Sequence, residues 1–236
     1  MFPREPGMGQ AITSANITSD PQSGIGGWSD ALKLRAIRDG IGRDGRVLNE
    51  RMPYRRFRHM SDEDAFSLVA YLNTLTPVKH ELPRPKPLFA GWLQKRLPPA
   101  ESVPQPNRAN TREYGRYLAT LGGCRGCHTA SRTTIGRVEY GGGRRFHLAG
   151  GTVVSSNITP DPYTGIGRWS DADWLGRVYQ YREYVERGSP KVGPENLTVM
   201  PWLGLTQLEP EDLKAIFAYL RTQKAVYRPI VLHPLE

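Results

Sequence analysis

Residues 16–31 read NITSDPQSGIGGWSDA, and residues 157–172 read NITPDPYTGIGRWSDA. Twelve of the sixteen positions are identical, at an offset of 141 residues. A second match, at an offset of 148, aligns residues 52–54 (MPY) with residues 200–202 (MPW). Self-similarity of this kind indicates a tandem duplication, in which the second copy has seven extra residues between its two matched segments.

A proline-rich segment separates the two copies. We expect a first repeat at residues 1–82, a linker at residues 83–109 and a complete repeat at residues 110–236. Within the linker, an apolar run in residues 88–97 is compatible with a short helix against either repeat.

Each copy is expected to end in an amphipathic helix. Apolar side chains follow one another at i, i+3, i+4 and i+7 from Ala65 to Leu72 and again from Leu213 to Leu220. Ser61 is a suitable N-cap for the first of these helices, and Pro210 suits the first turn of the second.

Further helices are predicted outside the two terminal ones. One helix is expected to start after Ser29 and end at Gly40, and another to start after Ser170. A pattern over residues 111–121 predicts a helix that occurs only in the second copy. The predicted fold class is therefore all-α, with two tandem helical repeats and long ordered loops.

Composition excludes several classes of protein. Glycine and proline together make up 45 of the 236 residues, which favours short elements joined by loops. No apolar run approaches the roughly 20 residues that cross a bilayer, so we expect no transmembrane segment. Two cysteines cannot build a disulfide scaffold. The net charge of +9 favours anionic partners, but no nucleic-acid-binding motif accompanies it, and no nucleic-acid partner is expected.

The sequence Cys124-Arg-Gly-Cys127-His128 contains both cysteines of the chain. Two thiols at this spacing can each form a thioether with one vinyl group of a heme, and the following histidine becomes an axial ligand. A zinc site would need four ligands, and a thioredoxin-like dithiol would need a βαβ context. The motif therefore predicts a covalently attached heme c with His128 on the iron.

Met200 is the candidate for the second axial ligand. It lies in a loop C-terminal to the attachment motif and is followed by a proline, as is Met52 in the first copy. The alternative is that Met200 is an ordinary buried thioether in the core. A His128/Met200 pair would fill both axial positions and favour electron transfer over ligand binding.

These motifs together resemble the class I cytochrome c family, and more closely the bacterial tandem di-heme cytochromes c. That group includes the cytochrome subunits of periplasmic alcohol and aldehyde dehydrogenases. The resemblance implies that the helix before the motif crosses the C-terminal helix, so that Gly115 and Tyr117 meet the face bearing Phe217 and Leu220. It also implies that Asn157 and Trp169 line the propionate side of the heme, unless they only cap and pack their own loop.

The first copy departs from this pattern because it has no CxxCH motif. In the second copy His128 lies 29 residues before Asn157, and the same count from Asn16 falls before Met1. We expect the missing motif and an export signal to lie upstream of this chain; the alternative is a heme-less domain kept for docking. One heme c is thus expected here and a second in a longer form, with residues 1–60 less ordered than 110–236.

The expected function is electron transfer in a periplasmic respiratory or dehydrogenase-linked chain, without catalysis by the protein itself. The expected partners are redox proteins with acidic docking surfaces, among them a periplasmic dehydrogenase subunit. The alternatives are a heme peroxidase and a gas or redox sensor, both of which need a labile methionine ligand.

Overall fold

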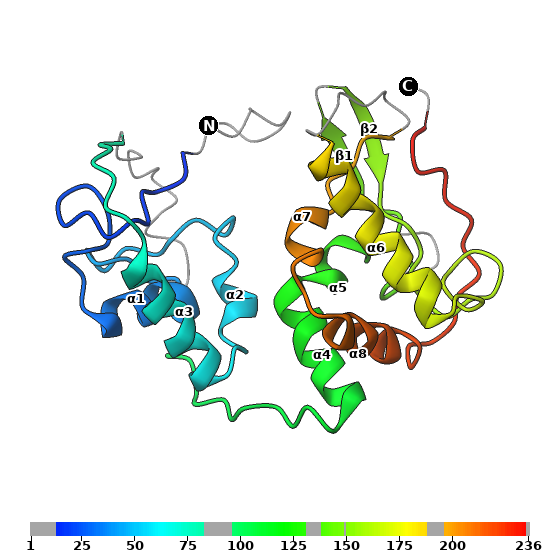
Figure 1. Ribbon diagram of the computed structural model, residues 1–236, viewed down its shortest axis with the longest axis horizontal. Coiled ribbons are helices and arrows are strands. Elements are labelled where there is room, and N and C mark those ends of the chain that lie inside the picture. The colour runs from blue at the N-terminus through cyan, green and yellow to red at the C-terminus, as the bar shows by residue number, and fades with distance from the viewer. Residues whose placement is uncertain (1–12, 83–95, 131–137, 149, 188–195, 235–236) are drawn as a thin grey trace. The chain divides into compact units, whose positions relative to one another are not determined.

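The computed structural model describes residues 13–82, 96–130, 138–148, 150–187 and 196–234. The chain divides into two compact units, residues 1–106 and residues 107–236, and each is described by itself below. In the described residues the structure is mostly helical, with eight helices and one two-stranded sheet (Figure 1). No helix in this part of the chain has both the length and the apolar character needed to span a membrane.

Unit 1 contains three helices, whose bounds are α1 (Asp30–Asp39), α2 (Tyr54–Phe57) and α3 (Asp62–Thr74). The predicted caps of α1 are confirmed: the Ser29 hydroxyl accepts a hydrogen bond from Leu32 N–H, and Gly40 ends the helix with a φ of 68°. Helix α3 begins at the predicted N-cap Ser61. Its apolar stripe is incompletely covered, because Ala65 and Val69 are buried while Leu68 and Leu72 are only half-buried.

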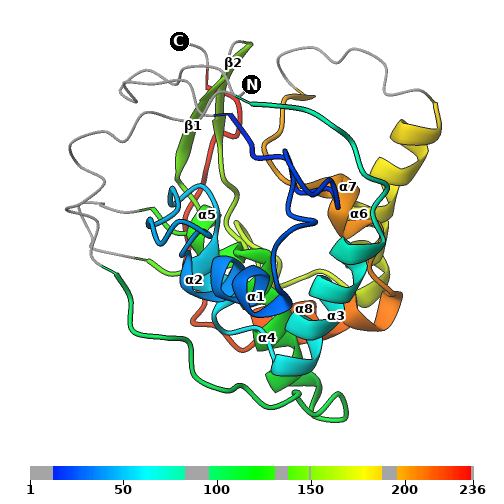
Figure 2. The same ribbon diagram turned by 90° about the vertical axis from the view of Figure 1, so that its left-hand side faces the viewer.

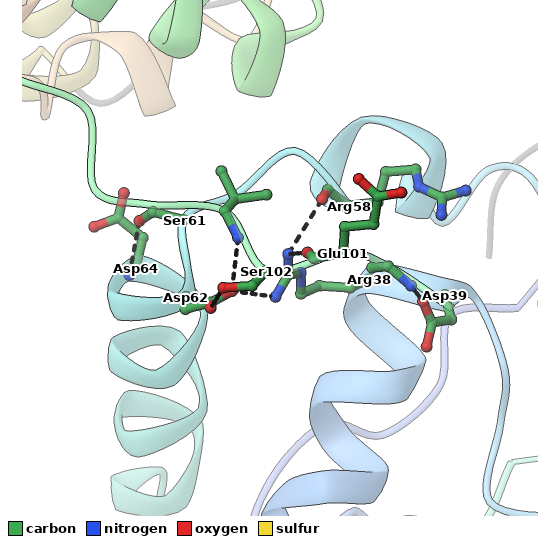
Figure 3. A network of polar contacts seen from close by, with 10 residues as sticks. Arg38, Asp39, Arg58, Ser61, Asp62, Asp64, Glu101 and Ser102 are labelled. Atoms are coloured by element: carbon green, nitrogen blue, oxygen red, sulfur yellow. Dashed lines mark hydrogen bonds and ion pairs between the residues drawn. The ribbon is translucent and has the colours of Figure 1, made fainter. Parts of the chain in front are cut away.

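The end of the predicted linker is bound to unit 1 (Figure 3). Asp62, at the start of α3, accepts hydrogen bonds from the Val103 N–H and the Ser102 hydroxyl. Its carboxylate also forms an ion pair with the Arg38 guanidinium at 2.6 Å. These bonds, with the Ser102 hydroxyl contributing most, hold the pKa of the Asp62 carboxyl below its usual value. Ala100 N–H donates to the Asp39 carboxylate at 2.6 Å. Residues 83–95, and with them most of the apolar run of the linker, lie outside the described residues.

Unit 2 contains the remaining elements, whose bounds are α4 (Thr111–Gly122), α5 (Cys124–Cys127), β1 (Arg145–Leu148), β2 (Gly151–Val154), α6 (Asp171–Glu186), α7 (Trp202–Leu205) and α8 (Pro210–Leu220). The predicted helix that is specific to the second copy is α4, and it packs across α8 (Figure 1). A Cβ atom at Gly115 would lie 1.8 Å from the Ala215 carbonyl oxygen, so the crossing needs glycine there. Gly115 therefore contacts α8 as predicted, but the predicted face is wrong: the contact is made at Ala215 and Tyr219 and not on the side bearing Phe217 and Leu220. The same prediction for Tyr117 stays a prediction.

The core of unit 2 lies around α8. The predicted stripe from Leu213 to Leu220 is buried, with Leu213, Ile216, Phe217 and Leu220 all less than 5% exposed. Trp174 of α6 stacks on Phe217, with ring centroids 5.3 Å apart, and its indole N–H donates to the Leu213 carbonyl. Apolar burial of this kind is the main stabilising contribution to a small helical domain.

The β-hairpin departs from the predicted all-α fold. β1 and β2 pair antiparallel, with Arg145 opposite Val154 and Leu148 opposite Gly151. Val154 N–H also donates to the Leu232 carbonyl at 2.8 Å, so the C-terminal segment runs beside the hairpin, as Figure 2 shows in red. Residues 152–154 (TVV) are β-branched and buried, which favours strand over helix.

Candidate functional site

The two cysteines lie in a single helical turn. Helix α4 ends at Gly122, Gly123 adopts a φ of 73°, and α5 begins directly at Cys124. His128 N–H donates to the Cys124 carbonyl at 2.9 Å, which closes the turn. Residues three apart on a helix share one face, so Cys124 and Cys127 lie on the same side of the turn. Both are thiols rather than a disulfide.

Side chains and backbone groups of residues 139–144 are bonded to this turn. The Arg144 guanidinium donates to the Gly126 carbonyl at 2.7 Å, and Arg125 forms an ion pair with Glu139. Gly142 N–H donates to the His128 carbonyl at 2.7 Å. These contacts hold the motif at Arg125, Gly126 and His128.

His128 is buried and has a defined tautomer. Its side chain is 7% exposed, and its Nδ1 lies 2.8 Å from the Ser156 carbonyl oxygen. A carbonyl can only accept, so Nδ1 carries the proton and donates, which leaves the lone pair on Nε2. Burial lowers the pKa of His128, and the hydrogen bond to Ser156 opposes this effect in part. A neutral imidazole with an unprotonated Nε2 is the form that coordinates a metal.

Asn157 follows the residue that orients His128. Its side-chain carbonyl accepts hydrogen bonds from the Thr159 N–H and hydroxyl, at 3.0 and 2.7 Å. Its side-chain NH₂ donates to the Thr164 hydroxyl and to the Val226 carbonyl. Asn157 is 4% exposed, and both ends of its amide are bonded within the protein. These contacts brace its own loop, and a role beside heme propionates stays a prediction.

Trp169 closes the same loop. Asp161 accepts hydrogen bonds from the Thr164 hydroxyl and from the Tyr163 and Thr164 N–H groups, and these bonds lower the pKa of its carboxyl, with Thr164 contributing most. Trp169 is half-buried, packs against the core around α8, and lies 6.4 Å from Trp174 between ring centroids. These contacts belong to loop packing, and the expected contact of Trp169 with heme likewise stays a prediction.

Met200 lies on a different element from the cysteines and His128. Its N–H donates to the Thr198 hydroxyl at 3.1 Å, and its carbonyl accepts from Trp202 N–H at 2.8 Å. The carbonyl of Met52 accepts from Tyr54 N–H at the same distance. The two Met-Pro turns thus share this backbone hydrogen bond, as their sequence match indicates. Ligation of iron by Met200 stays a prediction.

The structure brings together the cysteines, His128 and the start of the 157–169 loop, and it adds one residue that sequence reasoning missed. Ser156 acts through its backbone carbonyl, so its side chain carries no signal in the sequence. No group of three or more His, Cys, Asp or Glu side chains within the described ranges is arranged to hold a metal ion.

Comparison with known proteins identifies the family. No protein-family model matches the chain. It is 31% identical over 229 residues to a diheme c-type cytochrome of Cereibacter sphaeroides. The alignment covers 89% of this chain and 71% of the relative. The chain belongs to the diheme cytochrome c family.

Two further relatives are parts of dehydrogenases. This cytochrome is 36% identical over 222 residues to one of the subunits of nicotinate dehydrogenase from Pseudomonas putida, and 31% identical over 230 residues to the cytochrome c subunit of a quinone alcohol dehydrogenase of Gluconacetobacter polyoxogenes. Each alignment covers 89% of this chain, but only 18% and 47% of the respective relatives. The relatives support electron transfer by a c-type cytochrome, and together with the CxxC pair they indicate heme c.

Proposed function

We propose that this chain carries electrons through one covalently attached heme, bound by Cys124 and Cys127 and ligated by His128 and Met200. The heme, when bound, takes up and releases one electron at a time. The chain's own residues hold it in place, exclude water from it and set its potential. The protein performs no bond-making chemistry in this proposal.

The observation that carries the proposal is the hydrogen bond between His128 Nδ1 and the Ser156 carbonyl. It orients the ring and directs the Nε2 lone pair away from that carbonyl. His128 directly follows the turn that holds both thiols, so one short segment supplies the two attachment points and one ligand. Any buried imidazole N–H needs an acceptor, so the bond supports heme ligation through its combination with the two neighbouring thiols.

The proposal for Met200 rests on its loop. The Met-Pro turn holds the backbone of Met200 by hydrogen bonds on both sides, at Thr198 and Trp202. With His128 and Met200 as its two protein ligands, a bound heme iron would be favoured in the ferrous state and would not be open to oxygen or peroxide. Electron transfer without inner-sphere chemistry is the expected result.

The proposed partner is a dehydrogenase subunit with an acidic docking surface, in the periplasm. Relatives of this chain are named as cytochrome subunits of dehydrogenases. A net charge of +9 attracts acidic surfaces and increases the rate of encounter with them. Attachment of heme c takes place outside the bacterial cytoplasm in the family that the sequence resembles.

An absorption spectrum of the reduced pyridine adduct, measured against protein concentration, tests the proposal. We expect one heme per chain after maturation in a host that attaches heme c, and a colourless protein would overturn the proposal. Met200→Ala is expected to lose the far-red charge-transfer band of the oxidised protein. Met52→Ala, at the matched position of the first copy, is expected to keep it.

The two alternative functions give different results in the same preparation. A gas sensor would bind carbon monoxide in the ferrous state without denaturant, and a peroxidase would turn over peroxide. We expect neither, because a filled sixth position blocks both reactions. Either result would replace electron transfer as the function.

A further inference from the structure

The Met-Pro turn is held differently in the two copies. Helix α1 has 10 residues and ends at Gly40, whereas α6 has 16 residues. At the offset of 141, Gly40 corresponds to Tyr181, which lies within α6. At the offset of 148, Tyr54 corresponds to Trp202 at the start of α7. The two copies can therefore be compared at one pair of equivalent positions.

In unit 1 this pair is a glycine and a buried tyrosine. Tyr54 is 2% exposed, and its ring lies directly over Gly40. A Cβ atom at Gly40 would lie 2.4 Å from Cγ of the tyrosine ring, so no larger residue fits there. The tyrosine that follows the Met52-Pro turn is thus packed against the end of the preceding helix.

In unit 2 the same pair is an aromatic stack. The rings of Tyr181 and Trp202 are 4.4 Å apart between centroids and 5° from parallel. The guanidinium of Arg177, one turn earlier on α6, lies 5.4 Å from the Trp202 ring centroid and 5.9 Å from that of Tyr181. In both copies the aromatic residue after Met-Pro packs against the preceding helix. The contact is with a glycine in unit 1, and with a tyrosine ring and an arginine in unit 2.

The tryptophan is also bonded to the turn that contains Met200. Its indole N–H donates to the Thr198 hydroxyl at 3.0 Å, and the same hydroxyl accepts from Met200 N–H at 3.1 Å. The Met200 carbonyl accepts from Trp202 N–H. Met200 thus lies between two residues that are bonded to each other, and one of them is stacked on α6.

Further contacts fix α7 to the same helix. The Tyr179 hydroxyl donates to the Leu208 carbonyl at 3.2 Å, and the Arg182 guanidinium donates to the Thr206 carbonyl. Helix α6 therefore anchors the chain on the C-terminal side of Met200 at several points along its length.

We propose that Tyr181, Trp202 and Thr198 are positioning residues, which hold the Met200 turn closed against α6 and so keep other ligands from the sixth position. This inference rests on the proposed ligation by Met200. An external ligand can bind only while the turn is open, so its apparent affinity scales with the open fraction. An aromatic stack and a hydrogen bond together correspond to about a tenfold change in that fraction.

Titration of the oxidised, heme-loaded protein with imidazole, followed by loss of the far-red band, measures this fraction. We expect Trp202→Ala to bind imidazole about tenfold more tightly than the unmodified protein. Thr198→Val removes only the shared acceptor and is expected to raise the affinity severalfold. It remains a test if Trp202→Ala does not fold. Unchanged imidazole affinity in Thr198→Val and in a folded Trp202→Ala would overturn the inference.

Four variants separate positioning from general destabilisation. Tyr181→Phe keeps the stacked ring and is expected to behave as the unmodified protein, whereas Tyr181→Ala is expected to bind imidazole more tightly. Tyr163→Ala removes an exposed aromatic ring that also lies beside an arginine, Arg168, and it should leave the affinity unchanged. Val178→Ala, in the buried face of α6, should lower thermal stability without the tenfold gain, and an equal gain there would contradict positioning.

Met200→Ala distinguishes failure of this inference from failure of the proposed function. If this variant keeps the far-red band, Met200 is not the ligand and the proposed ligation is wrong. If it loses the band while Trp202→Ala, Thr198→Val and Tyr181→Ala all bind imidazole with unchanged affinity, the ligation stands and the positioning role is wrong.

Discussion

The two repeat loops, residues 16–28 and residues 157–169, have the same hydrogen bonds but different burial. Asn16 accepts from Thr18 N–H and donates to the Val78 carbonyl, as Asn157 does with Thr159 and Val226. Asp20 and Asp161 each accept from the two N–H groups that lie two and three residues later. The correspondence extends to the segment after the last helix of each copy, because Val78 and Val226 supply the matching carbonyl acceptors.

Burial separates the two loops. Ile17 is 54% exposed, whereas the equivalent Ile158 is 8% exposed, and the equivalents of Thr159 and Asp161 in unit 1 are only half-buried. The loop conformation is thus encoded by its own asparagine, aspartate and glycines. Its burial depends on other elements of the unit, among which α4 has no counterpart in the described part of unit 1.

The largest expected effect tests the role of α4. Gly115→Val places side-chain atoms against the Ala215 carbonyl, and we expect unit 2 to lose at least about 3 kcal/mol of unfolding free energy. Ser67→Val, at the equivalent of Ala215 in unit 1, is exposed and should change stability by no more than about 0.5 kcal/mol. Denaturant unfolding of the heme-loaded protein measures both; similar losses would mean that α3 is covered as α8 is.

A smaller effect is expected from the matched asparagines. Asn157→Ala leaves buried donors and acceptors without partners and should cost about 2–3 kcal/mol in unit 2, whereas water can replace the lost bonds in Asn16→Ala, at about 1 kcal/mol or less. Unfolding monitored by the heme absorbance for unit 2, and by amide exchange for unit 1, gives the two values. Equal costs would show that burial does not matter at these positions.

Amide exchange compares one bond in both loops. Ile25 N–H donates to the Thr18 carbonyl and Ile166 N–H to the Thr159 carbonyl, both at 2.9 Å. We expect the Ile166 amide to exchange at least about tenfold more slowly than the Ile25 amide. The loop of Ile166 is buried, so its opening requires the packing around it to be lost. Exchange followed by NMR measures the two rates. Equal protection would contradict the prediction that the first copy is less ordered.

The smallest expected effect concerns pH. Hydrogen bonds lower the pKa of both Asp20 and Asp161, chiefly those from Ser23 and Thr164. Each carboxylate thus stabilises its loop above the unfolded-state pKa of about 3.9, and this contribution is lost as pH falls through the lower folded-state value. The stability difference between the protein and Asp161→Asn should shrink between pH 6 and pH 3. Asp20→Asn should follow the same profile, and a flat profile for either would argue against its bonds.

Local signals in the sequence predicted most of the helices and the attachment motif. Ser29, Gly40 and Ser61 cap helices by contacts within a few residues, and such contacts can be read from sequence. The CxxCH motif is equally local. The predicted boundaries of the first copy and the linker stay predictions. The bond between Val103 and Asp62 could not be predicted, because it joins residues 41 positions apart.

Other features could not be predicted for related reasons. The hairpin at residues 145–154 follows a short pattern that is ambiguous between strand and loop, and its outer bond is made to the distant Leu232. The contact of His128 with Ser156 uses a backbone carbonyl that every residue possesses. The longer α6 was visible only as a change of offset, and its stack on Trp202 needed coordinates.

The attachment of residues 96–103 to unit 1 has a practical consequence for dissecting the chain. A fragment cut at residue 82 would remove the partners of Arg38, Asp39 and Asp62, and it would expose the start of α3 to solvent. Expression of the first half alone should therefore extend to Pro106.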